Sequence, residues 1–185
     1  MKSRCSRCEK YDLYRDYHDN ERWIAVHDDN IHFEFLVLES FQAWLSRYTI
    51  LKKRENFRLV FDWFDPDVIQ NYDEAKILEL LWDTWIVRHR GKIQATIYNA
   101  KLFIDIQKRY GSRDAYIRKY VWWKTIDNIF TDLSQVPGKT PLSDQISKDL
   151  KKLGMKFVWS TTIYAYMQAI GMVNDHVETC WKRQK

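Results

Sequence analysis

Apolar residues recur at helical spacing over much of this chain, and they predict a protein built mainly of helices. One clear helix begins at Asp29 or Asn30, either of which can cap it, and runs to about Ser46. Its apolar positions include Phe33, Leu36, Phe41 and Leu45. With 5 Gly and 3 Pro in 185 residues, the chain has few of the residues that the many turns of a β fold need. We therefore expect an all-α fold.

The middle of the chain carries a second group of helical patterns. Asp65 and Pro66 can open a short helix, and the stretch YDEAKILELLWDT (72–84) predicts another. A long amphipathic helix follows, marked by Ile93, Ile97, Ala100 and Ile104. The residues in between, Trp85 to Lys92, form a short hairpin in this interpretation. Residues 74–107 thus predict a helix-hairpin-helix arrangement.

The last third of the chain starts irregularly and ends in helices. Residues 114–140 are less periodic, and we expect irregular connections without a functional role there. Pro141 and Ser143 can open a helix that ends near Leu153, with Gly154 in the usual C-terminal position. The stretch STTIYAYMQAIGM (160–172) predicts the last helix.

The length and charge of the chain limit the classes of protein to which it can belong. A chain of 185 residues is long enough for one domain (1–185), which we expect to consist of two small helical lobes sharing one core. No stretch approaches the roughly 20 apolar residues that cross a bilayer, and MKSRCSRCEK at the start has no apolar run. We expect a cytoplasmic monomer. The formal net charge of +5 is compatible with a phosphate-bearing partner and equally with an ordinary soluble protein.

Glu39 lies inside the most apolar run of the chain, FEFLVLESFQAWLSRY (33–48). Burying an unpaired carboxylate is costly, so Glu39 should either face water or serve a function. Helical spacing alone does not decide between these two possibilities.

Cysteine and histidine residues gather at both ends of the chain. His176 and Cys180 are four residues apart, which places them on one face if the segment is helical. Near the other end lie Cys5, Cys8 and His18. Zinc favours four nitrogen and sulfur ligands in a closed structural site, so one pair from each end can complete a tetrahedron. Spacing alone does not choose Cys5 over Cys8, and buried thiols beside surface histidines remain an alternative.

Several blocks in the same order resemble one known family. They are RC followed by YHDNE, then LES, TILKKRENF, RHRGKIQATIYNA, SDQISKDLKK and GMKFV, and finally YMQAIGMVNDHVETC. Together they span nearly the whole chain and resemble 3-methyladenine DNA glycosylase I, a bacterial alkylation-repair enzyme of the helix-hairpin-helix superfamily. The resemblance implies a monofunctional glycosylase that hydrolyses the N-glycosidic bond of alkylated adenine in duplex DNA, with no lyase step. It also implies one structural zinc per chain on Cys5, His18, His176 and Cys180.

The resemblance assigns roles to further residues. Glu39 matches the pocket carboxylate that binds the flipped, positively charged base, and Tyr14 and Tyr17 match the aromatic lining. Plain core packing remains an alternative for both tyrosines. Gln42 and Leu45 match the segment that fills the gap left by the flipped nucleotide. The hairpin contributes backbone amides and the charges of Arg88, Arg90 and Lys92 to a DNA phosphate.

The chain departs from the family pattern in a regular way. The pattern has tryptophan where this chain has Arg7, Arg22 and Arg47, and glycine where it has Trp23, Trp44, Trp85 and Trp159. Such a regular exchange is unlike ordinary drift.

Each kind of departure has an expected consequence. Arg47, counted among the base-binding positions, would repel a cationic base and could pair with Glu39. Trp85 should strain the hairpin backbone, while Trp44 and Trp159 should overfill close-packed positions. The alternative to an active enzyme is therefore a catalytically weak or inactive zinc-stapled DNA-binding homologue.

Overall fold

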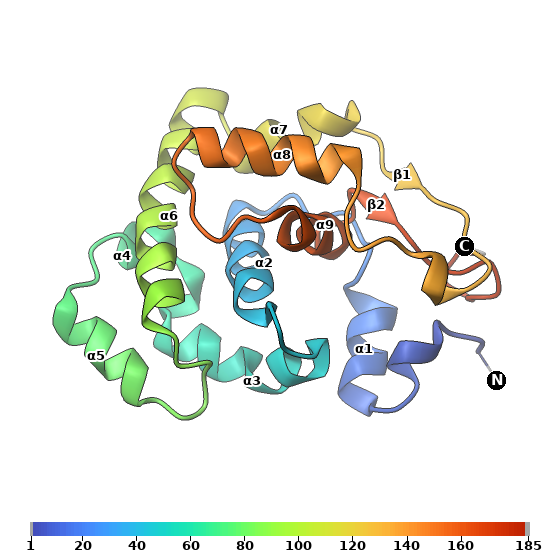
Figure 1. The fold of residues 1–185 in the computed structure, drawn as a ribbon, viewed down its shortest axis with the longest axis horizontal. Coiled ribbons are helices and arrows are strands. Elements are labelled where there is room, and N and C mark those ends of the chain that lie inside the picture. The colour runs from blue at the N-terminus through green and yellow to red at the C-terminus, as the bar shows by residue number, and fades with distance from the viewer. Residues whose placement is uncertain (1, 184–185) are drawn as a thin grey trace.

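A computed structural model describes residues 2–183 and shows a mostly helical molecule (Figure 1). The α-helices are α1 (Asp12–Asn20), α2 (Asp29–Gln42), α3 (Arg47–Val60), α4 (Pro66–Ile69), α5 (Glu74–Trp82), α6 (Arg90–Tyr110), α7 (Arg113–Arg118), α8 (Pro141–Lys152) and α9 (Ser160–Ala169). Short 3-10 turns cover Ser6–Cys8, Asp62–Phe64, Lys119–Val121 and Leu133–Gln135. Within residues 2–183, no helix is both long enough and apolar enough to span a membrane.

Helix α2 runs through the centre of the molecule and packs against α3, α6 and α9 (Figure 1). Its residues from His32 to Phe41 are all buried, so the helix is apolar on nearly every side rather than amphipathic. Asp28 caps it by accepting hydrogen bonds from the backbone N–H groups of Asn30 and Ile31. A central helix of this kind holds its few polar side chains, Glu34 and Glu39 among them, away from water.

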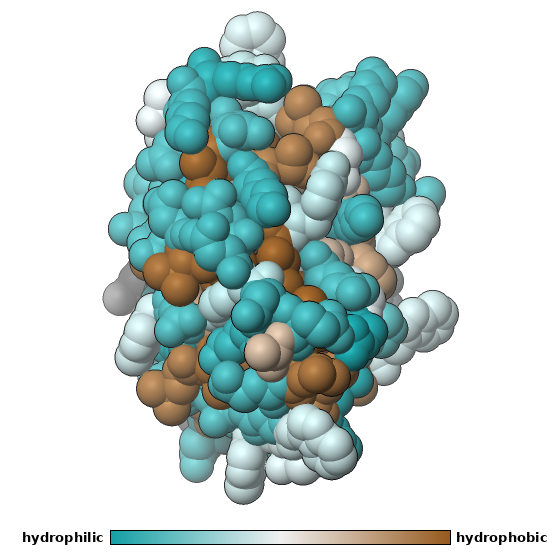
Figure 2. Space-filling view, turned by 90° about the vertical axis from the view of Figure 1, so that its left-hand side faces the viewer, coloured by the Kyte–Doolittle hydropathy of each residue, from teal (hydrophilic) through white to brown (hydrophobic). Residues whose placement is uncertain are grey.

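Helices α4 to α6 lie on one side of α2, helix α3 runs below it in the view of Figure 1, and both ends of the chain lie on the other side. Helices α5 and α6 are joined by residues 83–89 and pack against each other. Seen from the α4–α6 side, the surface is largely hydrophilic, with apolar side chains in separate patches (Figure 2).

Two strands of two residues each close the opposite side. Strand β1 (Ile126–Asp127) pairs in parallel with β2 (Val173–Asn174), with Ile126 opposite Val173. An isolated bridge between Phe130 and Val177 extends the contact. The irregular segment after α7 is thereby attached to the C-terminal segment. The sequence did not predict these strands.

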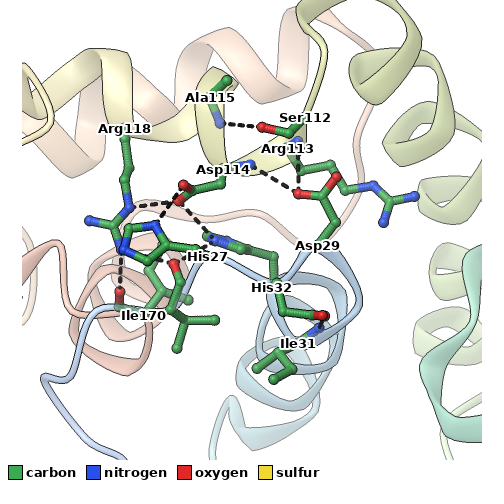
Figure 3. A network of polar contacts seen from close by, with 12 residues as sticks. His27, Asp29, Ile31, His32, Ser112, Arg113, Asp114, Ala115, Arg118 and Ile170 are labelled. Atoms are coloured by element: carbon green, nitrogen blue, oxygen red, sulfur yellow. Dashed lines mark hydrogen bonds and ion pairs between the residues drawn. The ribbon is translucent and has the colours of Figure 1, made fainter.

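A buried polar network joins α2 to α7 (Figure 3). Asp114 accepts a hydrogen bond of 2.6 Å from Arg118 Nε and lies 2.8 Å from His27 Nδ1 and 3.2 Å from His32 Nε2. Burial alone would raise the pKa of Asp114, but the hydrogen bonds from His32 and His27 and the Arg118 charge outweigh it and lower the pKa. Asp114 is therefore held as a carboxylate in the core.

The helix boundaries correct the sequence analysis at one important point. The helix expected to reach Ser46 ends at Gln42, and Ser46 instead caps α3 by accepting a hydrogen bond from Thr49 N. Helices α1 and α3 were not predicted. The break between α2 and α3 includes Trp44, whose φ of 72° lies in the left-handed region. The helices from α4 onward agree with the sequence analysis within a few residues, apart from α7 in the segment expected to be irregular.

Candidate active site and metal cluster

A cavity of about 630 Å³ opens between the N-terminal segment, the end of α2 and helix α9. Four tyrosines contribute to its wall, and two of them, Tyr11 and Tyr48, stack with ring centroids 3.7 Å apart. A third, Tyr14, accepts a hydrogen bond of 3.3 Å from Arg22 Nη1, while Arg22 Nη2 donates to Gln168 Oε1 at 2.7 Å. The cavity thus has aromatic faces and polar groups, which suits a flat heterocyclic ligand.

Glu39 and Tyr17 lie behind this cavity rather than on its wall. Glu39 on α2 is 4% exposed and Tyr17 on α1 is 2% exposed. Both border a much smaller void of about 10 Å³, and Arg47 borders the void as well as the cavity. The Arg47 side chain therefore stands between the open cavity and the buried carboxylate.

Arg47 is held in this place by Glu39. Its Nη2 donates to Glu39 Oε2 at 3.0 Å, and its Nη1 forms a second, short contact with Oε1. The guanidinium carbon also lies 5.7 Å from the centre of the Tyr17 ring. Burial alone would lower the pKa of Arg47, but the Glu39 charge, the nearby tyrosines and the hydrogen bond to Glu39 together outweigh it and raise the pKa. The pairing anticipated from the sequence is present, and it explains how a carboxylate is tolerated in an apolar helix.

The phenol of Tyr17 is the least satisfied group in this region. Its oxygen is buried and has no hydrogen-bond partner among the residues that the structure describes. Burial raises the pKa of Tyr17, so the group is a neutral phenol with a hydrogen left to donate. A buried donor without a partner is costly and is often found where a ligand supplies the missing acceptor.

The turn between α2 and α3 forms part of the cavity mouth. Gln42 and Ser46 border the cavity, and Leu45 N donates to Gln42 O at 2.7 Å to close the turn. Trp44 is 102% exposed, so its ring packs against none of the described residues. Leu45 is also exposed, which leaves an apolar tip on this turn. The overfilling expected at Trp44 and Trp159 is therefore wrong, because both side chains point to solvent.

The connection between α5 and α6 carries the expected basic residues in different environments. Arg88 is exposed, and Arg90 is exposed and forms an ion pair of 2.6 Å with Glu74. Lys92 is instead 7% exposed, and its ammonium donates to Phe41 O at 3.1 Å. Burial lowers the pKa of Lys92. Lys92 therefore holds the end of α2 and is not available to a phosphate, which corrects its expected role.

Trp85 does not strain this connection as expected. Its φ is not positive, its side chain is exposed, and its backbone N–H donates to Asp83 Oδ1 at 2.7 Å. An ordinary side chain is therefore accepted at this position.

A second cluster joins the two ends of the chain. One ligand atom from each of its four members lies within 4.8 Å of the others, and all four residues are buried: Cys5, His18, His176 and Cys180. Cys180 Sγ lies 3.2 Å from His176 Nδ1. This is the set that the family resemblance implies. Segment 176–180 is a turn rather than the helix considered for it, and the bridge at Val177 positions its ends.

The donor set fits a zinc ion. Two thiols and two imidazoles are the ligands of closed tetrahedral zinc sites. His18 Nδ1 contacts Asp19 Oδ1 at 2.8 Å, and Arg4 in turn holds Asp19, which is the kind of outer contact that orients a metal-binding histidine. Cys8 lies outside the set, with its thiol donating to Cys5 O at 3.1 Å. The structure thus makes the choice between Cys5 and Cys8 that spacing left open.

Comparison with known proteins adds to this geometry. The model of the methyladenine glycosylase family matches residues 7–183. The chain belongs to this family. Among curated relatives, DNA-3-methyladenine glycosylase 1 of Escherichia coli is 42% identical over 177 residues, covering 96% of this chain and 95% of the relative. DNA-3-methyladenine glycosylase of Haemophilus influenzae is 39% identical and covers 97% of each chain.

Solved structures of the methyladenine glycosylase family share the fold. A crystal structure of 3-methyladenine DNA glycosylase I superposes with a TM-score of 0.93 at 41% identity, covering 97% of this chain and 98% of the other. The enzyme from Staphylococcus aureus, studied for its recognition of 3-methyladenine, gives a TM-score of 0.93 at 31% identity, covering 98% and 97%. The fold of this chain is therefore that of family members across its whole described length.

Several residues of the cavity wall were not found by sequence reasoning. Among them are Tyr11, Tyr48 and Gln168. Tyr11 and Tyr48 come from segments far apart in sequence and meet only through folding, so no local pattern marks them. Gln168 lies on α9 next to apolar residues. Its amide is buried and donates to Asp175 Oδ2 at 2.6 Å, and only the structure shows that burial.

Proposed function

We propose that this protein is a DNA-3-methyladenine glycosylase, which hydrolyses the bond between an alkylated adenine and its deoxyribose in duplex DNA. The observation that carries the proposal is the buried Glu39 carboxylate, which already accepts two contacts from a flat cation beside a tyrosine-lined cavity. A methylated adenine is also a flat cation with an N–H edge. Family membership supplies the reaction class.

The reaction asks little of the protein beyond binding. A positively charged base is a good leaving group, so flipping it out, excluding water from its faces and admitting one water to the sugar carbon suffice. Glu39 accepts from the exocyclic amine and offsets the charge of the base, and the free phenol of Tyr17 donates a hydrogen bond to it. Tyr14 provides an aromatic face. No group is required to form a covalent bond to the sugar, so strand cleavage is not expected.

DNA is positioned by two surface elements. Helix α5, residues 83–89 and helix α6 act as a helix-hairpin-helix whose backbone amides, with Arg88 and Arg90, bind a phosphate. Gln42 and Leu45, on the turn at the cavity mouth, enter the gap left by the flipped nucleotide. The protein acts as a monomer, because neither surface element needs a second copy. It works as a single domain in the cytoplasm.

One structural zinc per chain completes the protein. Cys5, His18, His176 and Cys180 would hold it, and the ion would tie the N-terminal segment that carries Tyr14 and Tyr17 to the C-terminal segment. The ion supplies stability and takes no part in the reaction.

The decisive experiment must allow for Arg47. Replacing Glu39 alone leaves the buried guanidinium without its partner, so a loss of activity could reflect misfolding. We would therefore measure release of 3-methyladenine from methylated duplex DNA by the parent, by Arg47→Trp and by Arg47→Trp with Glu39→Gln, each checked for folding. We expect release by Arg47→Trp and a strong loss on adding Glu39→Gln. A folded Arg47→Trp variant that binds DNA but releases no base would refute the proposal.

A further inference from the structure

Several tryptophans of this chain have a backbone conformation that is typical of glycine. Five tryptophans have a positive φ: Trp23 (63°), Trp44 (72°), Trp63 (54°), Trp122 (51°) and Trp123 (62°). The chain has nine tryptophans in all, so more than half of them adopt a conformation that is an outlier for a bulky residue. Among the other aromatic residues, none of the eleven tyrosines has a positive φ, and two of the nine phenylalanines do, Phe64 and Phe157, both at 58°.

Trp44 and Trp122 occupy the position that glycine usually takes at the end of a helix. Trp122 has φ 51° and ψ 37° directly after the 3-10 turn Lys119–Val121, and its backbone N–H donates to Lys119 O. Trp44 is the third residue of the turn Gln42–Leu45, after Ala43 at φ −47° and ψ 123°, which is the position that takes glycine in a type II turn. Gly111, with φ 83°, ends α6. A left-handed residue after a helix is normally glycine because any Cβ is crowded there.

The rings of these residues do not compensate for the backbone. Trp44 is 102% exposed and Trp122 is 85% exposed, and Trp63 and Trp123 are also exposed. Large aromatic side chains are normally among the most buried in a protein. Trp23 is buried, yet its indole N–H has no hydrogen-bond partner among the described residues. The ring therefore gives no structural reason for tryptophan at the exposed positions.

The composition points the same way. The chain has 5 glycines and 9 tryptophans, whereas about 7% glycine is usual, which for this length is roughly 13 residues. Exchanging the five left-handed tryptophans for glycine would bring the count close to that value. The deficit and the strained positions therefore have one common explanation.

We propose that the residues at 23, 44, 63, 122 and 123 are glycine in the protein as its own cells make it. At these five positions the cells would insert glycine for a codon that is otherwise translated as tryptophan. At position 44 the consequence reaches DNA, because the turn between Gln42 and Leu45 then presents bare backbone instead of an indole. The inference concerns the chain itself and does not depend on the proposed reaction.

The first test compares glycine with alanine at the strained positions. Both replacements remove the exposed ring, but only glycine relieves a left-handed backbone. We expect Trp44→Gly and Trp122→Gly to exceed Trp44→Ala and Trp122→Ala in the folded-to-unfolded ratio by about fivefold or more. Trp82 is the matched control, because it is equally exposed but ends helix α5, where alanine should be the more stable of the two.

The second test reads the residues directly. Peptides of the protein purified from its own cells are identified by mass spectrometry, and residues 120–124 carry two of the positions on one short tryptic peptide. Glycine at 122 and 123 supports the proposal, and tryptophan at both overturns it. Alanine variants as stable as glycine variants at 44 and 122 would remove its structural basis.

Discussion

Arg47 and Glu39 form a two-point ion pair that separates the open cavity from the carboxylate at its inner end. A planar cation thus already occupies the edge of Glu39 to which, in the proposed function, a methylated adenine binds. Any base that reaches Glu39 must displace the guanidinium, which then remains as a like charge nearby. The geometry therefore predicts that this one side chain lowers activity without changing the fold.

Arg47→Trp should raise the release of 3-methyladenine by about tenfold or more. The change frees Glu39 and replaces a repelling cation by a ring that attracts a cationic base, a contact of about 0.5 to 2 kcal/mol. Arg47→Met separates the two effects, since it removes the charge without adding a ring, and it should fall between the parent and Arg47→Trp. Single-turnover excision on methylated duplex DNA measures all three. An unchanged rate in a well-folded Arg47→Trp variant would show that the ion pair does not limit the enzyme.

Metal analysis of the purified protein should find about one zinc per chain. Cys180→Ser removes one of the four clustered ligands and should lose the ion together with several degrees of thermal stability. Cys8→Ser is the control, because Cys8 is a buried thiol outside the cluster. Equal zinc content in both variants would argue against the cluster as the binding site.

Arg88 and Lys92 should behave differently although both are basic and belong to the same connection. Arg88→Gln removes an exposed charge and should reduce the slope of log K against log salt for duplex binding by about one. Lys92→Met removes the donor to Phe41 O and should destabilise the fold by about 1 to 2 kcal/mol while leaving that slope unchanged. Salt titration and denaturant unfolding of both variants measure the two effects. A reduced slope for folded Lys92→Met would restore its role at the DNA.

Acid should weaken the network around Asp114. The pKa of this carboxyl is lowered in the folded protein, so its stabilisation is complete above its unfolded value of about 3.9 and is lost as the pH falls through the folded value. At neutral pH, Asp114→Asn should cost about 3 to 5 kcal/mol, because it leaves Arg118 buried without its charge partner. Urea unfolding between pH 7 and 3 should show that the difference in free energy of unfolding between parent and variant becomes smaller below about pH 4. A constant gap would mean that the carboxylate charge is not what stabilises the network.

Local patterns predicted some elements of this fold better than others. Helices α6 and α8 were predicted because their apolar positions repeat over several turns and their ends carry clear signals such as Pro141 and Gly154. The end of α2 was missed because apolar residues continue at helical spacing as far as Leu45, while the backbone turns at Trp44. Helix α3 was missed for the same reason, since its cap at Ser46 was assigned to the preceding helix.

The prediction of the candidate site depended more on the family resemblance than on the spacing of residues in the sequence. Glu39 could be flagged from the sequence because a carboxylate in an apolar run is costly. Its separation from the cavity by Arg47, the stacking of Tyr11 on Tyr48 and the burial of Lys92 depend on contacts between distant segments. The resemblance also predicted glycine at 23 and 44, where φ is positive, and at 85 and 159, where no left-handed backbone occurs.

The metal cluster also sets an order of events during synthesis. Cys5 and His176 are 171 positions apart, and Cys180 is made later still. A growing chain therefore carries two members of the cluster from the start and cannot bring all four together until residue 180 has left the ribosome. Until then the thiol of Cys5 is open to oxidation or to a loosely held ion. Closure of the cluster thus reports that synthesis has passed residue 180.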